Sequence, residues 1–192
     1  MGDLSQTAID MTVIGGYLGA GKTTLLNHIL TQTQEPVAVL INDFGDINID
    51  DELIESTDEN TISLTNGCIC CSLADGYSSA LQEIKVRQPR PKRLVIEASG
   101  VADPAAIAAY GHAPGLYLNA VVVVVDGANV EQQLSDSMVG QTVANQIAAA
   151  DLIVLNKRDL VGDPSKIWRE LKGLNSEAMI VECTHSQINL NV

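Results

Sequence analysis

Short runs of apolar and β-branched residues recur along the chain, separated by helical patterns or polar loops. The runs are apolar throughout rather than alternating, which is typical of strands buried on both faces of a parallel sheet. Helical patterns cover residues 22–33 and 72–87. Because helical crossovers join parallel strands, the pattern predicts an α/β three-layer sandwich with a mostly parallel central sheet. The predicted strands are 11–17, 36–43, 61–65, 93–100, 119–127, 151–157 and 178–184.

The length and charge of the chain narrow its class. Its 192 residues suit one domain with a sizeable core, so we expect a single domain over 1–192. The formal net charge of −13 argues against nucleic acid and anionic membrane surfaces as partners. The N-terminal residues lack the features of a signal peptide, and the longest apolar run is too short to span a bilayer. We therefore expect a soluble, cytoplasmic protein.

The segment GYLGAGKT, Gly16 to Thr23, fits the phosphate-loop pattern G-x-x-x-x-G-K-[ST] between a predicted strand and a predicted helix. In this motif, backbone N–H groups at a helix N-terminus surround the phosphates of a nucleotide. Lys22 would reach the β- and γ-phosphates, and the Thr23 hydroxyl would bind Mg²⁺. The pattern therefore predicts nucleotide binding. The residues expected at the phosphates are Gly16, Gly19, Ala20, Gly21, Lys22, Thr23 and Thr24.

The segment LNKRD follows a predicted strand and contains N-K-x-D, the pattern with which P-loop GTPases recognise guanine. An Asp carboxylate can accept hydrogen bonds from the ring N–H and the exocyclic amine of guanine together, whereas adenine leaves such groups unmatched. Asn156, Lys157 and Asp159 are therefore predicted to select GTP and GDP. Cys183 and Thr184 follow the last predicted strand, where a loop normally packs over the base, and are further candidates for contacts with it.

The predicted strand RLVIEASG carries an acid and then a glycine near its end. Glu97 stands where P-loop proteins keep a carboxylate for Mg²⁺ or for aligning the attacking water. Gly100 could place a backbone N–H near the γ-phosphate. An alternative is that Glu97 only caps the helix that follows. Lys22 and Glu97 are accordingly predicted catalytic residues.

Three of the four cysteines, Cys68, Cys70 and Cys71, stand together in the segment NGCICCS. Thiolates suit Zn²⁺ or another thiophilic cation such as Co²⁺, and three ligands on one loop indicate an open, exchangeable site. Buried structural cysteines and a redox dithiol are the two other interpretations. Asp43 and Asp46 lie on the loop after the second predicted strand, beside the expected γ-phosphate site. Ordering of this loop by GTP could assemble the cysteine site, and hydrolysis would release the metal.

The segments GGYLGAGKTTLLNHIL, NDFGDINID, LTNGCICC, RLVIEASGVADP and LNKRD occur in the order found in CobW-type metallochaperone GTPases, which the chain resembles from about residue 12 to its end. These are SIMIBI-class P-loop proteins, so the resemblance implies a P-loop NTPase fold and slow hydrolysis of GTP with Mg²⁺. It also implies delivery of a transition metal, Zn²⁺ first and Co²⁺ as the alternative, to a client metalloprotein, with a homodimer left open. Asp43 joins Lys22 and Glu97 as a predicted catalytic residue. The predicted metal contacts are Cys68, Cys70, Cys71, Thr23, Asp43 and Asp46.

The chain departs from the family pattern in three respects. Family members commonly have N-E-x-G-E after the second strand, whereas Asp43 and Asp46 are each one methylene shorter and can need a bridging water to reach a metal. The C-terminal domain of the family and its His-rich stretch are both absent from the sequence, so we expect the GTPase domain alone. Three rival functions remain: cobalt delivery for cobalamin synthesis, a metal store or sensor with incidental hydrolysis, and a signalling GTPase without a metal.

Overall fold

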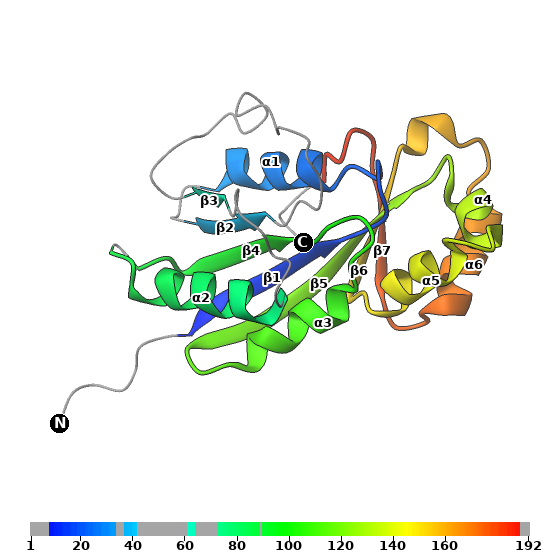
Figure 1. Cartoon of the computed structure of the whole chain (residues 1–192). Coiled ribbons are helices and arrows are strands. Elements are labelled where there is room, and N and C mark those ends of the chain that lie inside the picture. Colours follow the sequence, from blue (N-terminus) through cyan, green and yellow to red (C-terminus); the bar gives the residue numbers. More distant parts are fainter. Residues whose placement is uncertain (1–7, 34–36, 42–60, 64–72, 89, 189–192) are drawn as a thin grey trace.

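The computed structural model describes residues 8–33, 37–41, 61–63, 73–88 and 90–188. These residues form a seven-stranded sheet in the order β3-β2-β4-β1-β5-β6-β7, in which all neighbouring strands are parallel. Helices lie on both faces of the sheet (Figure 1). The predicted three-layer α/β sandwich is confirmed. The strands are β1 (Ile9–Gly15), β2 (Val37–Ile41), β3 (Thr61–Ser63), β4 (Arg93–Glu97), β5 (Leu116–Asp126), β6 (Leu152–Asn156) and β7 (Met179–Glu182).

The first two helices agree with the helical patterns in the sequence to within one residue at each end. They are α1 (Lys22–Gln32) and α2 (Leu73–Val86), against predictions of 22–33 and 72–87. Further helices connect the later strands. They are α3 (Pro104–Ala108), α4 (Val130–Ser135), α5 (Gly140–Ala148), α6 (Ser165–Leu174) and two 3-10 helices, Ala109–His112 and Arg158–Leu160.

Two strands differ from the predicted boundaries by three residues at one end: β4 ends at Glu97 rather than at residue 100, and β5 begins at Leu116 rather than at residue 119. The first half of β5 alternates between exposed and more buried positions, with Tyr117 and Asn119 exposed. This half pairs with β1, while β6 pairs with β5 only from Val122 onward. The first half of β5 therefore has a strand neighbour on one side and is buried on one face. A search for continuous apolar runs misses this half because its residues alternate.

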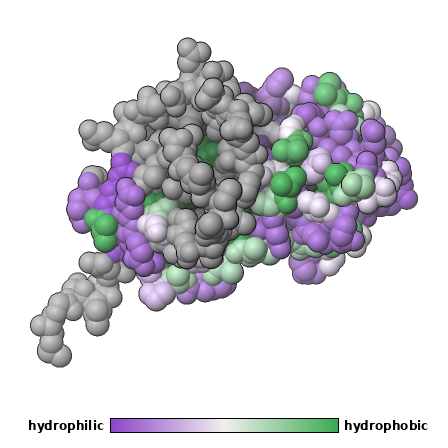
Figure 2. Space-filling view, in the orientation of Figure 1, coloured by the Kyte–Doolittle hydropathy of each residue, from purple (hydrophilic) through white to green (hydrophobic). Residues whose placement is uncertain are grey.

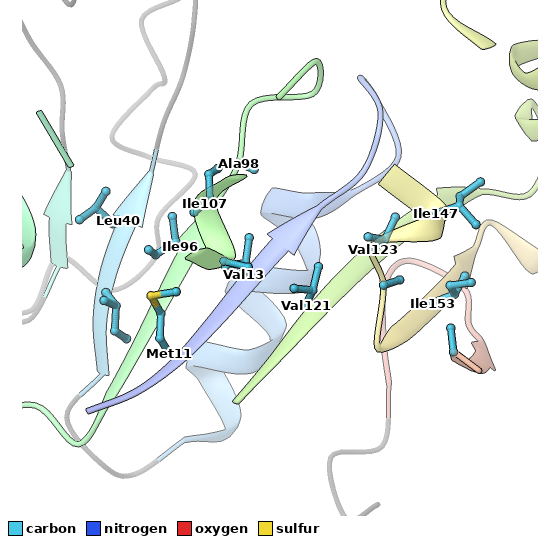
Figure 3. Packing of buried hydrophobic residues seen from close by; sticks show 14 of the residues in the cluster. Met11, Val13, Leu40, Ile96, Ala98, Ile107, Val121, Val123, Ile147 and Ile153 are labelled. Atoms are coloured by element: carbon cyan, nitrogen blue, oxygen red, sulfur yellow. The ribbon is translucent and has the colours of Figure 1, made fainter. Parts of the chain in front are cut away.

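Two hydrophobic clusters fill the space between the sheet and its helices. Along β5, Val121 and Val123 belong to one cluster and Val122 belongs to the other, so the clusters lie on opposite faces of the sheet. The larger cluster joins the sheet to α2, α3, α5 and α6, and Figure 3 shows Ile107 of α3 and Ile147 of α5 among its members. On the opposite face, α1 packs against the smaller cluster (Figure 1).

The register of the sheet brings the carboxyl ends of its central strands to one edge. Ile14 is level with Glu97 in the β1–β4 pair, and Asp126 is level with Asn156 in the β5–β6 pair. The loops that follow these strands meet above this edge. A ligand site in an open parallel sheet lies in this place.

The exposed face seen in Figure 2 is largely hydrophilic over the described residues, with hydrophobic residues in small groups. Within the described part of the chain, every helix is too short or too polar to cross a lipid bilayer.

Candidate functional site

The phosphate-loop segment between β1 and α1 adopts a backbone that requires glycine at two positions. Gly16 has a φ of 133°, and a Cβ built there would lie 2.3 Å from the carbonyl oxygen of Val124. Gly21 has a φ of 107°, and its Cβ would lie 2.5 Å from the side-chain nitrogen of Asn156. Gly19 also has a positive φ, of 73°, but a Cβ there would meet nothing within 4 Å. The loop is therefore packed tightly at both ends and borders open space at its tip, as a cradle for a ligand requires.

Lys22 is the first residue of α1, and its side chain turns back over the loop. Its Nζ lies 3.4 Å from the carbonyl oxygen of Tyr17, and the residue is buried. The cap residue of the helix is Gly21, which has no side chain to satisfy the first N–H groups of the helix. A positive helix N-terminus beside a buried ammonium group suits a bound phosphate. Ala20 is buried beneath this end, whereas Thr24 is exposed.

The next residue of the helix contacts the acid at the end of β4. Thr23 Oγ1 donates a 2.7 Å hydrogen bond to Glu97 Oε1, although 74 residues separate the two in the sequence. The Glu97 side chain is buried. A hydroxyl and a carboxylate oxygen at this distance are donors of the type that Mg²⁺ selects, so the pair fits this cation.

The alternative role for Glu97, as a cap of the next helix, is wrong. The cap residue of α3 is Asp103, whose carboxylate accepts a 2.9 Å hydrogen bond from the backbone N–H of Ala105. Between these two acids, Gly100 packs closely on the phosphate loop, since a Cβ there would lie 2.9 Å from the backbone nitrogen of Leu18.

Asn156 stands at the end of β6 and links the phosphate loop to the segment after β7. Its Nδ2 donates to the carbonyl oxygen of Ala20 and to Ser186 Oγ, each at 2.9 Å. Its Oδ1 accepts hydrogen bonds from the Ser186 N–H at 2.8 Å and from the Cys183 thiol at 3.5 Å. All polar atoms of this buried amide are thus occupied in holding three segments together.

Ser186 is a site residue that the sequence reasoning missed. Its exposed fraction is 0%, and its hydroxyl donates a 3.0 Å hydrogen bond to the carbonyl oxygen of Gly21. His185 and Ser186 both have left-handed backbones, with φ values of 52° and 54°. A single serine after a strand carries no local signal of this role, because the role arises from the turn and from long-range packing.

Lys157 is fixed by a second residue that the sequence reasoning did not select. Its backbone is left-handed, with a φ of 59°, and its Nζ lies 2.8 Å from Asp126 Oδ2. Asp126 is buried at the end of β5 and also accepts a 2.8 Å hydrogen bond from Asn129 Nδ2. Burial disfavours the charged carboxylate, but the hydrogen bonds from Lys157 and Asn129 hold the pKa of Asp126 below its ordinary value of 3.8.

The remaining candidates on the base side differ in exposure. Asp159 is exposed in the 3-10 helix after β6, and Thr184 is half-buried. The neighbouring Arg158 is anchored through a 2.8 Å ion pair with Glu182. Cys183 is buried in the core, and burial raises the pKa of its thiol to about 11. Cys183 is therefore a neutral, buried thiol near neutral pH.

The structure describes one of the six predicted metal contacts, Thr23. Asp43, Asp46, Cys68, Cys70 and Cys71 lie outside the described residues. In the part of the chain that the structure describes, no cluster of three or more His, Cys, Asp or Glu side chains could hold a metal ion.

A glycine-rich loop leading from the first strand of a parallel sheet into a helix, with a lysine over the loop and a buried acid beside it, defines the chain as a P-loop NTPase. The family model described as "CobW/HypB/UreG, nucleotide-binding domain" matches residues 10–182. The chain belongs to this family, and the family prediction is confirmed.

Three relatives show how similar the chain is to known proteins. The zinc chaperone YjiA of Escherichia coli (strain K12) is 35% identical over 96% of this chain and 60% of its own length. The zinc chaperone CobW of Sinorhizobium sp is 35% identical over 82% of this chain and 53% of its own length. The zinc-regulated GTPase metalloprotein activator 1 of Schizosaccharomyces pombe (strain 972 / ATCC 24843) is 32% identical over 97% of this chain and 48% of its own length. The chain therefore spans about half to three fifths of these relatives.

Solved structures agree with this assignment. The crystal structure of Zn(II)-bound YjiA GTPase from E. coli superposes with a TM-score of 0.70 at 30% identity, covering 95% of this chain and 60% of that one. The hydrogenase maturation factor HypB from Archaeoglobus fulgidus superposes with a TM-score of 0.66 over 92% of this chain and 81% of that one. At 21% identity, the likeness to HypB supports the fold alone.

Proposed function

We propose that this chain is the GTP-binding and GTP-hydrolysing domain of a zinc metallochaperone. The observation that carries the proposal is the Asn156 amide, which joins the phosphate loop to the segments proposed to hold guanine. The similarity to proteins named zinc chaperones, at 35% identity, supports zinc as the metal.

The phosphate end of the site supplies positioning and charge. The N–H groups at the start of α1 and the Lys22 ammonium would hold the β- and γ-phosphates of GTP. Thr23 and Glu97 would hold Mg²⁺, which neutralises phosphate charge when bound. Glu97 and Asp43 are the acids assigned to orienting the water that attacks the γ-phosphorus as the bond to the β-phosphate oxygen breaks. GDP and phosphate leave without a covalent intermediate. Gly100 would direct a backbone N–H toward the γ-phosphate.

The base end of the site would select guanine through Asp159. This carboxylate is exposed, whereas Asn156 is fully occupied by Ala20, Cys183 and Ser186. Asp159 would therefore accept the guanine N–H groups, and Asn156 would fix the loops around it. Lys157, held by Asp126, and the segment at Thr184 would line the base.

The metal is the cargo of the proposed cycle rather than a resident cofactor. Cys68, Cys70 and Cys71 would bind Zn²⁺, and Asp43 and Asp46, which follow β2 in the sequence, would couple the γ-phosphate to the metal. Thiolates prefer Zn²⁺ over hard cations, which is the chemical reason for naming it. Hydrolysis would loosen the loop and release Zn²⁺ to a client metalloprotein.

Two measurements on the full 192-residue chain test the proposal. Hydrolysis of GTP and ATP is compared at equal concentrations, and we expect strong preference for GTP that is lost in Asp159→Asn. Zn²⁺ affinity is then measured with GDP and with a non-hydrolysable GTP analogue, and we expect tighter binding with the analogue. Equal hydrolysis of ATP would overturn the guanine assignment. Equal Zn²⁺ affinity in both nucleotide states, or unchanged affinity in Cys70→Ser, would overturn the metal cycle.

A further inference from the structure

Gln146 is a polar residue in the hydrophobic side of α5. Its exposed fraction is 2%, and the flanking core residues of the helix are apolar, with Val143 and Ile147 in the larger hydrophobic cluster. The amide therefore needs a reason of its own, because a buried polar group is costly unless it is hydrogen-bonded.

The partners of Gln146 lie in the loop that follows the proposed catalytic acid. Its Nε2 donates to the carbonyl oxygen of Gly100 at 3.1 Å and to that of Ala102 at 2.9 Å. Both donor hydrogens of the amide thus serve one loop, from a helix 46 and 44 residues later in the chain.

This loop is fixed at its two ends by other contacts. At the start, the Ala98 N–H donates to the carbonyl oxygen of Ile14 at 2.9 Å, which continues the sheet beyond Glu97. At the end, Asp103 caps α3. The middle of the loop, including Gly100, has the Gln146 amide on one side and Leu18 of the phosphate loop on the other.

The two hydrogen bonds contribute to how the loop faces the phosphate loop, together with the turn in which the Ala102 N–H donates to the Ser99 carbonyl oxygen at 3.0 Å. In a trans peptide, the C=O of one residue and the N–H of the next point in opposite directions. Holding the Gly100 carbonyl toward α5 therefore turns the Val101 N–H away from α5. In the same way, holding the Ala102 carbonyl toward α5 turns the Asp103 N–H away from α5. Gln146 thus orients two peptide groups, Gly100–Val101 and Ala102–Asp103, beside the proposed γ-phosphate site.

We propose that Gln146 is a positioning residue for GTP hydrolysis, which acts by fixing the loop between Glu97 and α3 against the phosphate loop. This inference rests on the proposed hydrolysis of GTP. Gln146 touches neither nucleotide nor water in this role. Its loss affects the arrangement of the hydrolysing state more than the binding of GDP, which depends on α1 and on the base site.

The experiment uses Gln146→Met, which keeps an unbranched side chain of similar length and removes both hydrogen bonds. The matched control is Gln141→Met on the exposed face of the same helix, where the amide donates a 2.7 Å hydrogen bond to Asn145 Oδ1. We expect kcat for GTP to fall about 10- to 100-fold in Gln146→Met, since small misplacements near the reacting groups cost this much. KM for GTP and affinity for GDP should stay within about threefold, and the control should match the wild type in every quantity.

Three outcomes would overturn the inference. One is unchanged kcat in a folded Gln146→Met protein. Another is a fall in kcat together with a rise in KM and weaker binding of GDP, which a general weakening of the fold would produce. The second variant is Gln146→Asn, whose shorter amide cannot reach both carbonyls. The third outcome is loss of folding in both variants, which would assign Gln146 to the core alone. If the wild type itself fails to hydrolyse GTP, the proposed function fails instead.

Discussion

The side-chain nitrogen of Asn156 donates a 2.9 Å hydrogen bond to the carbonyl oxygen of Ala20, 136 residues earlier in the chain. This bond runs from the end of β6 to the phosphate loop, so the two ends of the proposed nucleotide site share one buried amide. Ser186 strengthens the junction, since its hydroxyl donates to the carbonyl oxygen of Gly21. The segments proposed to bind the base and the phosphates are therefore joined by one hydrogen-bonded junction.

The first prediction concerns the stability of this junction. Asn156→Ala leaves the buried Ala20 carbonyl and the Ser186 N–H without their partner, and we expect a loss of about 2–4 kcal/mol in the free energy of unfolding. Urea unfolding followed by circular dichroism measures it. Asn145→Ala, at an exposed position of α5, should stay within about 0.5 kcal/mol of the wild type. A loss no larger than that of the control would show that the junction contributes little.

The second prediction concerns Mg²⁺. Thr23→Val preserves the shape of the side chain but removes the hydroxyl that contacts Glu97, and Thr23→Ser keeps it. We expect Thr23→Val to weaken Mg²⁺-dependent GTP binding by about tenfold or more, because hydrogen bonds and ligands to charged groups are worth about 1.5–3 kcal/mol. Fluorescence titration with a labelled GTP analogue, with and without a chelator, measures the effect.

With the chelator present, the Thr23→Val variant should bind the GTP analogue as tightly as the wild type. With Mg²⁺ present, the Thr23→Ser variant should bind it as tightly as the wild type. A valine variant that keeps its full response to Mg²⁺ would remove Thr23 from the cation site.

Much of the fold follows from local patterns in the sequence. Apolar runs predicted the central strands, and the Mg²⁺ role expected of both Thr23 and Glu97 implied that these residues would come together, in keeping with the rule that ligands lie beyond the carboxyl ends of parallel strands. The glycine spacing predicted the phosphate loop, since Gly16 and Gly21 are required by the close approach of Val124 and Asn156. Such features are readable because each depends on a few neighbouring residues and on the sheet.

The residues that the sequence reasoning missed depend on distant parts of the chain. Ser186 and Gln146 are ordinary polar residues until the fold places their partners beside them. Asp126 differs, because it ends an apolar strand in the same way as Glu97 and the same rule would have found it. The early start of β5 at Leu116 was missed because its first half is exposed on one side.

The third prediction concerns the pH dependence of stability at Asp126. The carboxylate has a pKa held below 3.8 in the folded protein, so its stabilising effect is complete above that value and is lost as the pH falls through the folded pKa. Asp126→Asn should therefore lower the free energy of unfolding near neutral pH by about 2 kcal/mol, because the Lys157 ion pair is lost. Below 3.8 the difference between the two proteins should shrink.

Urea unfolding at a series of pH values measures this difference, and Asp136→Asn, at an exposed position, is the control. A difference that stays constant down to the acid limit would show that the charge of Asp126 does not contribute.

The last prediction concerns the reactivity of Cys183. Burial raises the pKa of this thiol from 9.0 to about 11, so the native protein holds little thiolate near neutral pH. In a Cys68→Ser, Cys70→Ser, Cys71→Ser protein, which keeps this one thiol, we expect alkylation by iodoacetamide to be far slower than that of free cysteine. Concentrated guanidinium chloride should restore the normal rate, and mass spectrometry measures both. Alkylation of the native protein at the rate of free cysteine would place Cys183 on an open surface and remove it from the Asn156 junction.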